Sequence, residues 1–532
     1  MKRSKKAISI ALGVVLAATP VALAGCSGDS YTEVTFPAQN TSYVVTSQGG
    51  SVVSYGNYMY FINGTRGYDD VNGTANLWGN VVKGALYRAE LNGTTEKDET
   101  GHNVFKPQMD EECLEFKYTK GEDYFGNPVN VVNTQSIAPK TVGTSGYSRG
   151  GLFIYDNYVY FASPNNEKNK YGTVQTSRTD FFMMPLSGGE PTKLYTTGEG
   201  ISTASSAYAF YKYAGAVYLV TYEDTKIVSV KIDVAKEKAN DPVYFEVNAS
   251  SVYFPVRDTY YSGIGTNTLE DFIYFVRNAT DSDNQTSGTV IEAMRPDGTE
   301  NFVVSKNGQT ETIEAVRDGL FFYRTTEVTS TYIKFTNLHE MLMVHSPTYK
   351  AEQDKLPADK KTVNIPTEKF PSEIPGDVTS TYPFRDSAST NEVFLIASSG
   401  SGIRLYTNDI ANPLVGTITP DTGTVLFVKD NYVYFSGSDS NYFRAPVFRH
   451  MEGWGGEPQE LATSVATAGI SCDYAMGYFT YFAKVDEWAN AYTYFYKVDG
   501  VAGMEPQFVG VRAGSDIPSA EQIEAAKDSS SK

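Results

Sequence analysis

A hairpin signal that recurs along the chain limits its possible folds more than any other feature. The clearest copy is residues 152–161, Leu-Phe-Ile-Tyr-Asp-Asn-Tyr-Val-Tyr-Phe, in which two apolar runs flank Asp156-Asn157. Asp and Asn tolerate the positive φ that a two-residue turn between antiparallel strands requires. Equivalent pairs occur at eight places: Gly56-Asn57, Asp156-Asn157, Ala214-Gly215, Glu270-Asp271, Asp318-Gly319, Thr390-Asn391, Asp430-Asn431 and Met476-Gly477.

Further strands follow several of these hairpins. Segments 86–91, 181–186, 227–232, 290–294, 442–447 and 494–498 predict third strands. Glu-Pro pairs at 190–191, 457–458 and 505–506 lead into a fourth strand, where proline suits the first position of an outer strand. The shortest intervals between hairpins, 40 and 46 residues, fit one four-stranded repeat unit.

The second strand of each unit predicts how the units pack. Every side chain in 158–161 and 432–435 is aromatic or aliphatic, although successive side chains point to opposite faces. Both faces must therefore be covered, as they are when blades stack in a closed ring. We predict an all-β fold, a β-propeller of four-stranded antiparallel blades. Eight blades are favoured, and seven is the alternative if the weak hairpin at Thr390-Asn391 lies in an insertion.

The N-terminus carries a targeting pattern. Four basic residues among 1–6 precede a mostly apolar run, 7–22, and the tetrapeptide Leu23-Ala24-Gly25-Cys26. This tetrapeptide resembles the bacterial lipobox. The resemblance implies removal of residues 1–25, diacylglycerol attachment to the Cys26 thiol and a lipid-anchored place on the cell membrane, facing outward from the cytoplasm. The alternative is an ordinary secreted protein with a chance cysteine.

The composition of the remaining chain predicts three regions. Residues 26–50, rich in Ser, Thr and Gly, are expected to be the lipidated N-terminus and a flexible tether. The propeller is expected over 51–512, with insertions near 94–148 and 346–380, the first of which is alternatively a small inserted domain. Residues 513–532 predict a short helix and a disordered tail.

The net charge of the chain disfavours two classes of binding partner. The formal charge of the chain is −18, and removing residues 1–25, which carry four positive charges, leaves −22. An acidic surface repels phosphate backbones and anionic headgroups, so we expect no nucleic acid partner and no membrane contact except through the lipid. Solubility outside the cell is the simpler reason for the charge.

The repeats resemble those of a known group of proteins. Tyr-x-Tyr-Phe followed by Leu-Tyr-Arg-x-x-x-x-Gly, as in residues 86–93, is similar to the repeats of bacterial β-propeller lipoproteins, including families described only as domains of unknown function. TolB-like and YWTD propellers are more distant relatives. The resemblance covers about residues 50–512 and implies an architecture, because propellers of one shape bind ligands or carry enzymes.

No residue pattern specifies a reaction, a metal or a cofactor. Apart from Cys26, only Cys113 and Cys472 remain, and they either form a disulfide across the ring closure or stay two thiols. His339 and His345 lack the HExxH spacing, and if their segment is a strand they lie about 20 Å apart. We therefore predict no catalytic residues, no metal and no cofactor.

Polar turns between second and third strands form the candidate ligand surface, since a propeller places all such turns on one face. Polar groups beside exposed rings suit sugars or extended peptides. Calcium is a weaker alternative, because no turn completes a twelve-residue calcium loop. The candidate residues are Tyr68, Asp69, Asp70, Asn165, Asn166, Asp281, Asp283, Asp439, Asn441 and Trp488.

The leading functional hypothesis is a binding or scaffold module for a glycan, a peptide or an envelope protein. Two alternatives stay open. One is a hydrolase or lyase that acts on glycans through paired carboxylates on the propeller face. The other is a structural subunit of an envelope assembly.

Overall fold

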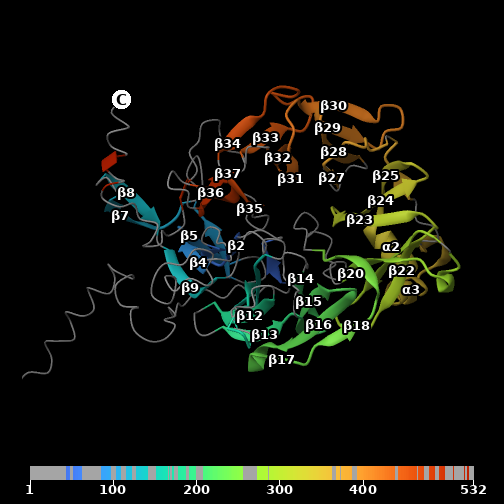
Figure 1. The fold of residues 1–532 in the computed structure, drawn as a ribbon, viewed down its shortest axis with the longest axis horizontal. Coiled ribbons are helices and arrows are strands. Elements are labelled where there is room, and N and C mark those ends of the chain that lie inside the picture. Colours follow the sequence, from blue (N-terminus) through green and yellow to red (C-terminus); the bar gives the residue numbers. More distant parts are fainter. Residues whose placement is uncertain are drawn as a thin grey trace, which may run out of the picture.

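The computed structural model arranges antiparallel sheets around a central axis (Figure 1). It describes residues 44–47, 52–62, 85–97, 103–108, 115–122, 127–132, 134–141, 151–165, 178–186, 191–198, 208–255, 272–285, 287–361, 367–371, 373–385, 392–429, 431–437, 441–463, 465–472, 479–485, 491–497 and 507–508, with Glu167, 170–172, Glu521 and 524–525 besides. Among these residues, no helix is both long and apolar enough to cross a bilayer. The predicted all-β propeller is confirmed.

The first three blades contain the two five-stranded sheets. Blade 1 is β2 (Val52–Tyr55), β3 (Tyr58–Ile62), β4 (Ala85–Glu90) and β9 (Thr134–Thr141). Blade 2 is β1 (Val45–Thr46), β10 (Phe153–Tyr155), β11 (Tyr158–Pro164), β12 (Thr179–Pro185) and β13 (Thr192–Thr196). Blade 3 is β14 (Tyr208–Tyr213), β15 (Ala216–Glu223) and β16 (Lys226–Asp233), with β17 (Lys238–Ala239) and β18 (Val243–Phe245) both paired to β16.

The next four blades have four strands each. Blade 4 is β19 (Ala249–Tyr253), β20 (Ile273–Asn278), β21 (Thr289–Met294) and β22 (Asn301–Lys306). Blade 5 is β23 (Thr310–Arg317), β24 (Leu320–Glu327), β25 (Ser330–Asn337) and β26 (Glu368–Lys369). Blade 6 is β27 (Ser380–Arg385), β28 (Val393–Ser399), β29 (Gly402–Thr407) and β30 (Leu414–Thr419), and blade 7 is β31 (Thr424–Lys429), β32 (Tyr432–Ser436), β33 (Tyr442–Pro446) and β34 (Gln459–Ala462).

The favoured count of eight four-stranded blades is wrong. Hydrophobic clusters of described side chains join seven consecutive sheets, blades 1 to 7, face to face. One further sheet, β35 (Val465–Cys472), β36 (Phe479–Val485), β37 (Ala491–Lys497) and β38 (Gln507–Phe508), is described by its backbone pairing alone. Counting hairpins treats every hairpin as a blade, whereas a propeller is built by packing between neighbouring sheets. Described side chains join seven sheets in this way, so seven is the blade count.

The hairpin turns and the two-sided strands explain the packing. Asp156 and Asn157 have φ values of 50° and 64°, as a two-residue turn between β10 and β11 requires. In β11, Tyr160 packs toward blade 3, with its ring centroid 5.0 Å from that of Phe210, while Phe161 packs toward blade 1 and stacks on Phe182 at 5.7 Å. Adjacent residues thus belong to two different blade interfaces, as the sequence pattern predicts.

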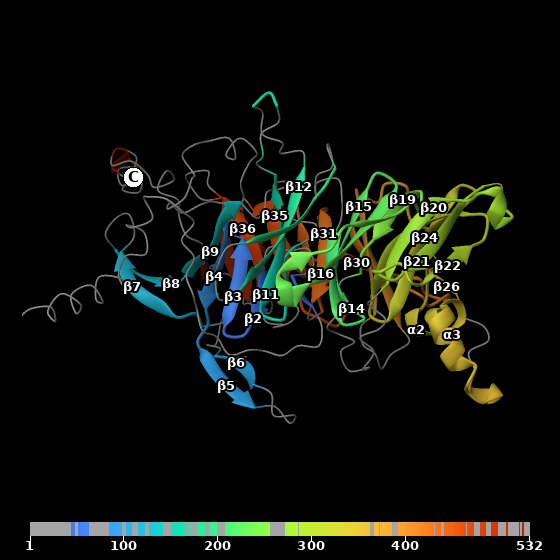
Figure 2. The same cartoon turned by 90° about the horizontal axis from the view of Figure 1, so that it is seen from below.

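Two connections between third and fourth strands are enlarged. In blade 1 the chain forms two-stranded sheets, β5 (Gly93–Lys97) with β6 (Asn103–Pro107) and β7 (Tyr118–Glu122) with β8 (Pro128–Val132), before it reaches β9. In blade 5 it forms α2 (Leu338–His345), α3 (Pro347–Gln353) and a 3-10 turn, Ala358–Lys360. The segment holding His339 and His345 is therefore a helix, so the distance given for the case of a strand does not apply. Figure 2 shows α2, α3 and the β5–β6 hairpin on the same side of the ring.

Candidate functional site

The strand directions define two faces of the ring. Turns between second and third strands lie on one side, the upper face, which is at the top of Figure 2. Turns between first and second strands, with α2, α3 and the β5–β6 hairpin, lie on the opposite side, the lower face. Of the candidate residues, Asn165, Asp281, Asp283 and Asn441 are described and belong to upper-face turns. Tyr68, Asp69, Asp70, Asn166, Asp439 and Trp488 lie outside the described residues.

Asn165 is completely buried at the upper end of β11. Its Nδ2 donates to Asp180 Oδ1 at 3.0 Å, and its Oδ1 accepts from the backbone N–H of Glu167 at 3.0 Å. Thr196 Oγ1 donates to the same Asp180 oxygen at 2.6 Å, from the outer strand β13. Asn165 thus fixes the start of the turn to two neighbouring strands of its own blade.

Asp283 lies in a 3-10 turn, Asp281–Asp283, that follows β20. Both of its oxygens accept from the guanidinium of Arg277, at 2.7 and 2.8 Å, and one also accepts from Thr280 N at 2.9 Å. Hydrogen bonds from Arg277 and Thr280 hold the pKa of the Asp283 carboxyl well below its ordinary value. Arg277 also binds Glu292 at 2.7 Å. The Asp283 carboxylate is engaged within the blade, whereas Asp281 is exposed.

Asn441 is bound within its own blade, and only one of the three cysteines lies among the described residues. Asn441 Nδ2 donates to Glu460 Oε2 at 2.9 Å, so this turn is also tied to the outer strand of its blade. Cys472 ends β35, while Cys113 and Cys26 lie outside the described residues, so the disulfide and the lipid site stay predictions. Within the described ranges, no group of three His, Cys, Asp or Glu side chains is placed to hold a metal ion.

Two exposed upper-face residues were missed. Tyr171 is 78% exposed in the turn between β11 and β12, and Lys170 Nζ lies 4.9 Å from its ring centroid. Val328 is 98% exposed in the turn between β24 and β25. Tyr171 had a visible signal, an aromatic residue in the polar stretch 164–172, whereas Val328 had none, because valine is rare at such a turn. An aromatic face, a cation and an aliphatic side chain are thus presented on two upper-face turns.

Val328 carries backbone strain. Its φ is 60°, in the left-handed region that a β-branched residue rarely adopts. We expect Val328→Asn to raise the free energy of unfolding by about 1 kcal/mol, because asparagine tolerates this conformation and the exposed valine contributes little packing. Chemical denaturation compares the variant with the parent. Val243→Asn, also exposed but in an ordinary strand conformation, is the control and should not stabilise. An unchanged or lowered stability of Val328→Asn would contradict the prediction.

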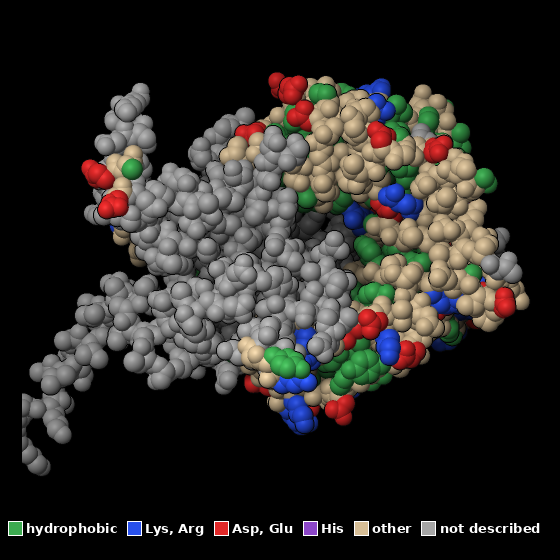
Figure 3. All heavy atoms as spheres, viewed as in Figure 1, with side chains coloured by type: hydrophobic (Ala, Val, Ile, Leu, Met, Phe, Trp, Pro, Cys, Tyr) green, Lys and Arg blue, Asp and Glu red, His purple; other side chains and the backbone are tan. Residues whose placement is uncertain are grey.

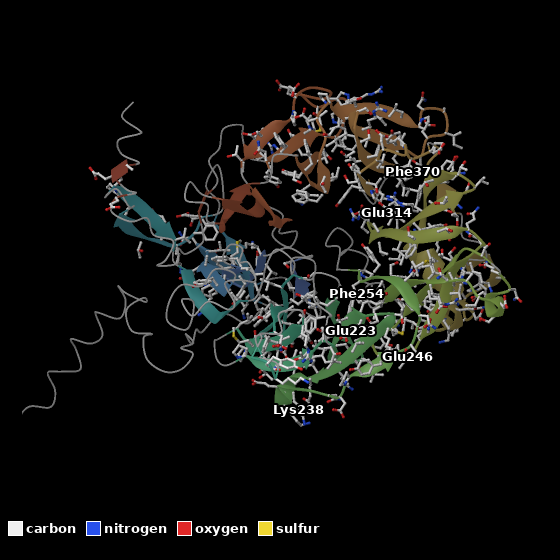
Figure 4. The ribbon with its side chains drawn as sticks, viewed as in Figure 1. Glu223, Lys238, Glu246, Phe254, Glu314 and Phe370 are labelled. Atoms are coloured by element: carbon white, nitrogen blue, oxygen red, sulfur yellow. The ribbon has the colours of Figure 1, made fainter. Side chains whose placement is uncertain are left out.

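The inner wall of the ring carries an ion pair within blade 5 that is hydrogen-bonded to a threonine of blade 6. Glu314 accepts from Arg324 Nε at 3.1 Å and from the hydroxyl of Thr381 on β27, and Arg324 also donates to Thr381 at 3.0 Å. Figure 4 shows Glu314 on the inner side of the ring, and Figure 3 shows a central opening with acidic and basic side chains on its described rim. This part of the wall presents both charges, already paired with each other.

One apolar hollow lies between blades 5 and 6. Phe370, Ile374, Leu395 and Tyr406 line it, and its volume is about 10 Å³. That is no more than the space for one water molecule, so this hollow is too small for a ligand. Of the regions that the structure describes, the upper face and the central opening are therefore the candidate recognition surfaces.

Comparisons with known proteins return propellers of low similarity. No protein-family model matches the chain, and no curated protein matches it. Similar solved structures include the Dos1 propeller (8% identity, 88% of this chain and 97% of that chain, TM-score 0.36). Another is a quinonprotein alcohol dehydrogenase-like protein from Bacteroides thetaiotaomicron (10% identity, 89% and 97%, TM-score 0.33). A third is the β-propeller domain of the Trilobed protease from Pyrococcus furiosus (9%, 79% and 97%, 0.29). At these scores the fold assignment rests on the strand pairing of the chain itself.

Proposed function

We propose that this protein is a lipid-anchored, extracytoplasmic propeller that acts as a binding or scaffold module, with its upper face as the recognition surface. The proposal rests on a contrast between two groups of residues in the upper-face turns, those hydrogen-bonded within their blades and those exposed to solvent. Asn165, Asp283 and Asn441 are bound inside their blades, while Tyr171, Asp281 and Val328 are presented to solvent. Residues already hydrogen-bonded within their blades need not be ordered on binding, which favours recognition by the exposed residues beside them.

The ligand class that fits these residues is a glycan or an extended peptide. An exposed tyrosine face stacks on sugar rings or apolar side chains, and the adjacent Lys170 adds a cation. The membrane anchor is supported by Leu23-Ala24-Gly25-Cys26, which resembles the lipobox. An envelope protein as partner belongs to the same proposal, because a rigid ring also suits a scaffold.

A glycan and peptide array probed with the mature domain tests this function. We expect binding to one of the two ligand classes, weakened about two- to twelvefold by Tyr171→Ala, since an aromatic contact contributes roughly 0.5–1.5 kcal/mol. Tyr118→Ala is the matched control: Tyr118 is 44% exposed with Lys120 Nζ 5.3 Å from its ring, but it lies on the β7–β8 insertion. Blank arrays together with recovery of one envelope protein in a pull-down would replace ligand recognition by a structural role.

A further inference from the structure

The first described strand fixes the side from which the chain enters the ring. β1 pairs antiparallel with β10, with Val45 opposite Ile154 and Thr46 opposite Phe153. β10 is the first strand of its hairpin and runs from the upper face to the lower-face turn at Asp156-Asn157. β1 therefore runs in the opposite direction, from the lower face upward. Val44, the residue before it, lies at the lower end of the inner wall.

Buried side chains and hydrogen bonds hold β1 in the propeller. Val45 is 8% exposed and belongs to the cluster between blades 1 and 2, and Val44 packs against the cluster between blades 2 and 3. At the upper end, Ser47 N donates to Leu152 O at 2.9 Å, and Leu152 N donates to Ser47 Oγ at 2.8 Å. Releasing β1 would expose apolar surface at two blade interfaces, so the direction of entry is a fixed property of the fold.

The length of the segment between Cys26 and Val44 limits which face of the ring can lie near the membrane anchor. Cys26 and Val44 are separated by the 17 residues 27–43. Fully extended they span about 60 Å, but a flexible chain of this length has a root-mean-square reach of about 24 Å. A seven-residue strand such as β11 is itself about 23 Å long, which sets the height of a blade. To bring the upper face to the anchor, the tether would have to cross this height and still pass around or through the ring.

We propose that the lower face is the surface that faces the lipid bilayer, and that the upper face is held away from it. This rests on the lipid anchor at Cys26 in the proposed function. Blade 5 then directs α2 and α3, and blade 1 the β5–β6 hairpin, toward the bilayer (Figure 2). The formal charge of −22 that remains without residues 1–25 opposes adsorption onto anionic lipid, so in this proposal the insertions space the ring from the membrane. Upper-face turns with Tyr171 and Val328 point toward extracellular ligands.

Fluorescence quenching on vesicles tests the orientation. The lipidated protein is reconstituted into phosphatidylcholine vesicles that contain a lipid with a headgroup quencher, in a background with Cys113→Ser and Cys472→Ser. One fluorophore is attached at Asp156→Cys on the lower face or at Asp224→Cys on the upper face. These positions are matched, since both are exposed aspartates in hairpin turns, with φ values of 50° and 55°. Ala214→Cys (lower, φ 48°) and Val328→Cys (upper, φ 60°) form a second matched pair.

We expect the lower-face labels to lose much of their emission and the upper-face labels to keep theirs. Equal quenching in both pairs, or stronger quenching at Asp224→Cys and Val328→Cys, overturns the orientation. Vesicle flotation separates this result from failure of the anchor itself, because protein that does not float with vesicles lacks the lipid. Protein that floats and shows reversed quenching keeps the anchor and refutes the orientation alone.

Discussion

Glu300→Ala is expected to lower the free energy of unfolding by about 3 kcal/mol. Glu300 accepts hydrogen bonds from Thr348 N and Oγ1 at 3.1 and 3.0 Å, and from the hydroxyl of Ser346, the N-cap of α3. It also pairs with Arg295 at 3.3 Å, and both side chains are less than 10% exposed. Removing one partner of a buried ion pair leaves the other charge uncompensated, which typically costs about 3–5 kcal/mol.

The same carboxylate predicts a pH dependence. Burial by itself would raise the pKa of Glu300, but hydrogen bonds from Ser346 and Thr348 and the charge of Arg295 outweigh it and leave the pKa below its ordinary value. The stability from this group is therefore present above the ordinary glutamate pKa and is lost as the pH falls through the lowered one. Urea unfolding of Glu300→Gln and the parent at neutral and acidic pH should show a difference that shrinks toward low pH.

Glu246→Ala supplies the control for both measurements. Glu246 pairs with Lys226 at 2.8 Å, but its side chain is 63% exposed, so its removal should change stability little. If Glu300→Ala were as mild as Glu246→Ala, α3 would not be held to blade 4 by this carboxylate. A double variant with Arg295→Met should recover part of the loss, because it also removes the uncompensated cation.

Phe161→Ala is expected to destabilise the propeller by about 4 kcal/mol. Its ring is completely buried between blades 1 and 2, and truncation of such a ring removes apolar contact and leaves a cavity. Tyr160→Phe, one residue earlier, is the matched control. The Tyr160 hydroxyl is buried with no hydrogen-bond partner among the described residues, so its removal should be neutral or stabilising by about 1 kcal/mol.

Calorimetry measures the unfolding temperature and enthalpy of both variants. It distinguishes a loss of packing at Phe161 from destabilisation by any substitution in β11. Burial raises the pKa of the Tyr160 hydroxyl, which is consistent with a group kept neutral and unsolvated in the core. A loss from Tyr160→Phe comparable to that from Phe161→Ala would show that the hydroxyl is bound, through a buried water for example, and would contradict the prediction for that residue.

The regular part of the fold could be predicted because its signals are local. Second strands such as β3, β11, β20 and β32 were located from a turn pair followed by aromatic residues. The third strands of blades 5 and 6, β25 and β29, were missed. β25 follows the turn at Val328, which lacks the glycine or asparagine that marks other turns, so its hairpin gave no signal.

The helices of blade 5 were missed although capping signals exist. Asn337 accepts from Glu340 N at 3.1 Å to begin α2, and Ser346-Pro347 begins α3. Both helices have eight residues or fewer, so the helical spacing of Leu338, Met341 and Leu342 extends over too short a stretch to distinguish a helix from a strand. At the upper face, Asn165 and Asp283 have the residue types of ligand-binding turns. Their partners Asp180 and Arg277 lie on strands that flank their turns, and that pairing is visible only in the structure.

The placement of β1 sets an order for folding. Ser47 is bonded to Leu152, 105 residues further along the chain, so the N-terminal strand has no docking site until the second blade exists. Contacts at such sequence separation form late, because the intervening loop must close first. If Cys26 carries the proposed lipid, the chain is already attached to the membrane at its N-terminus when β1 docks, so the ring closes around a strand whose upstream end is fixed.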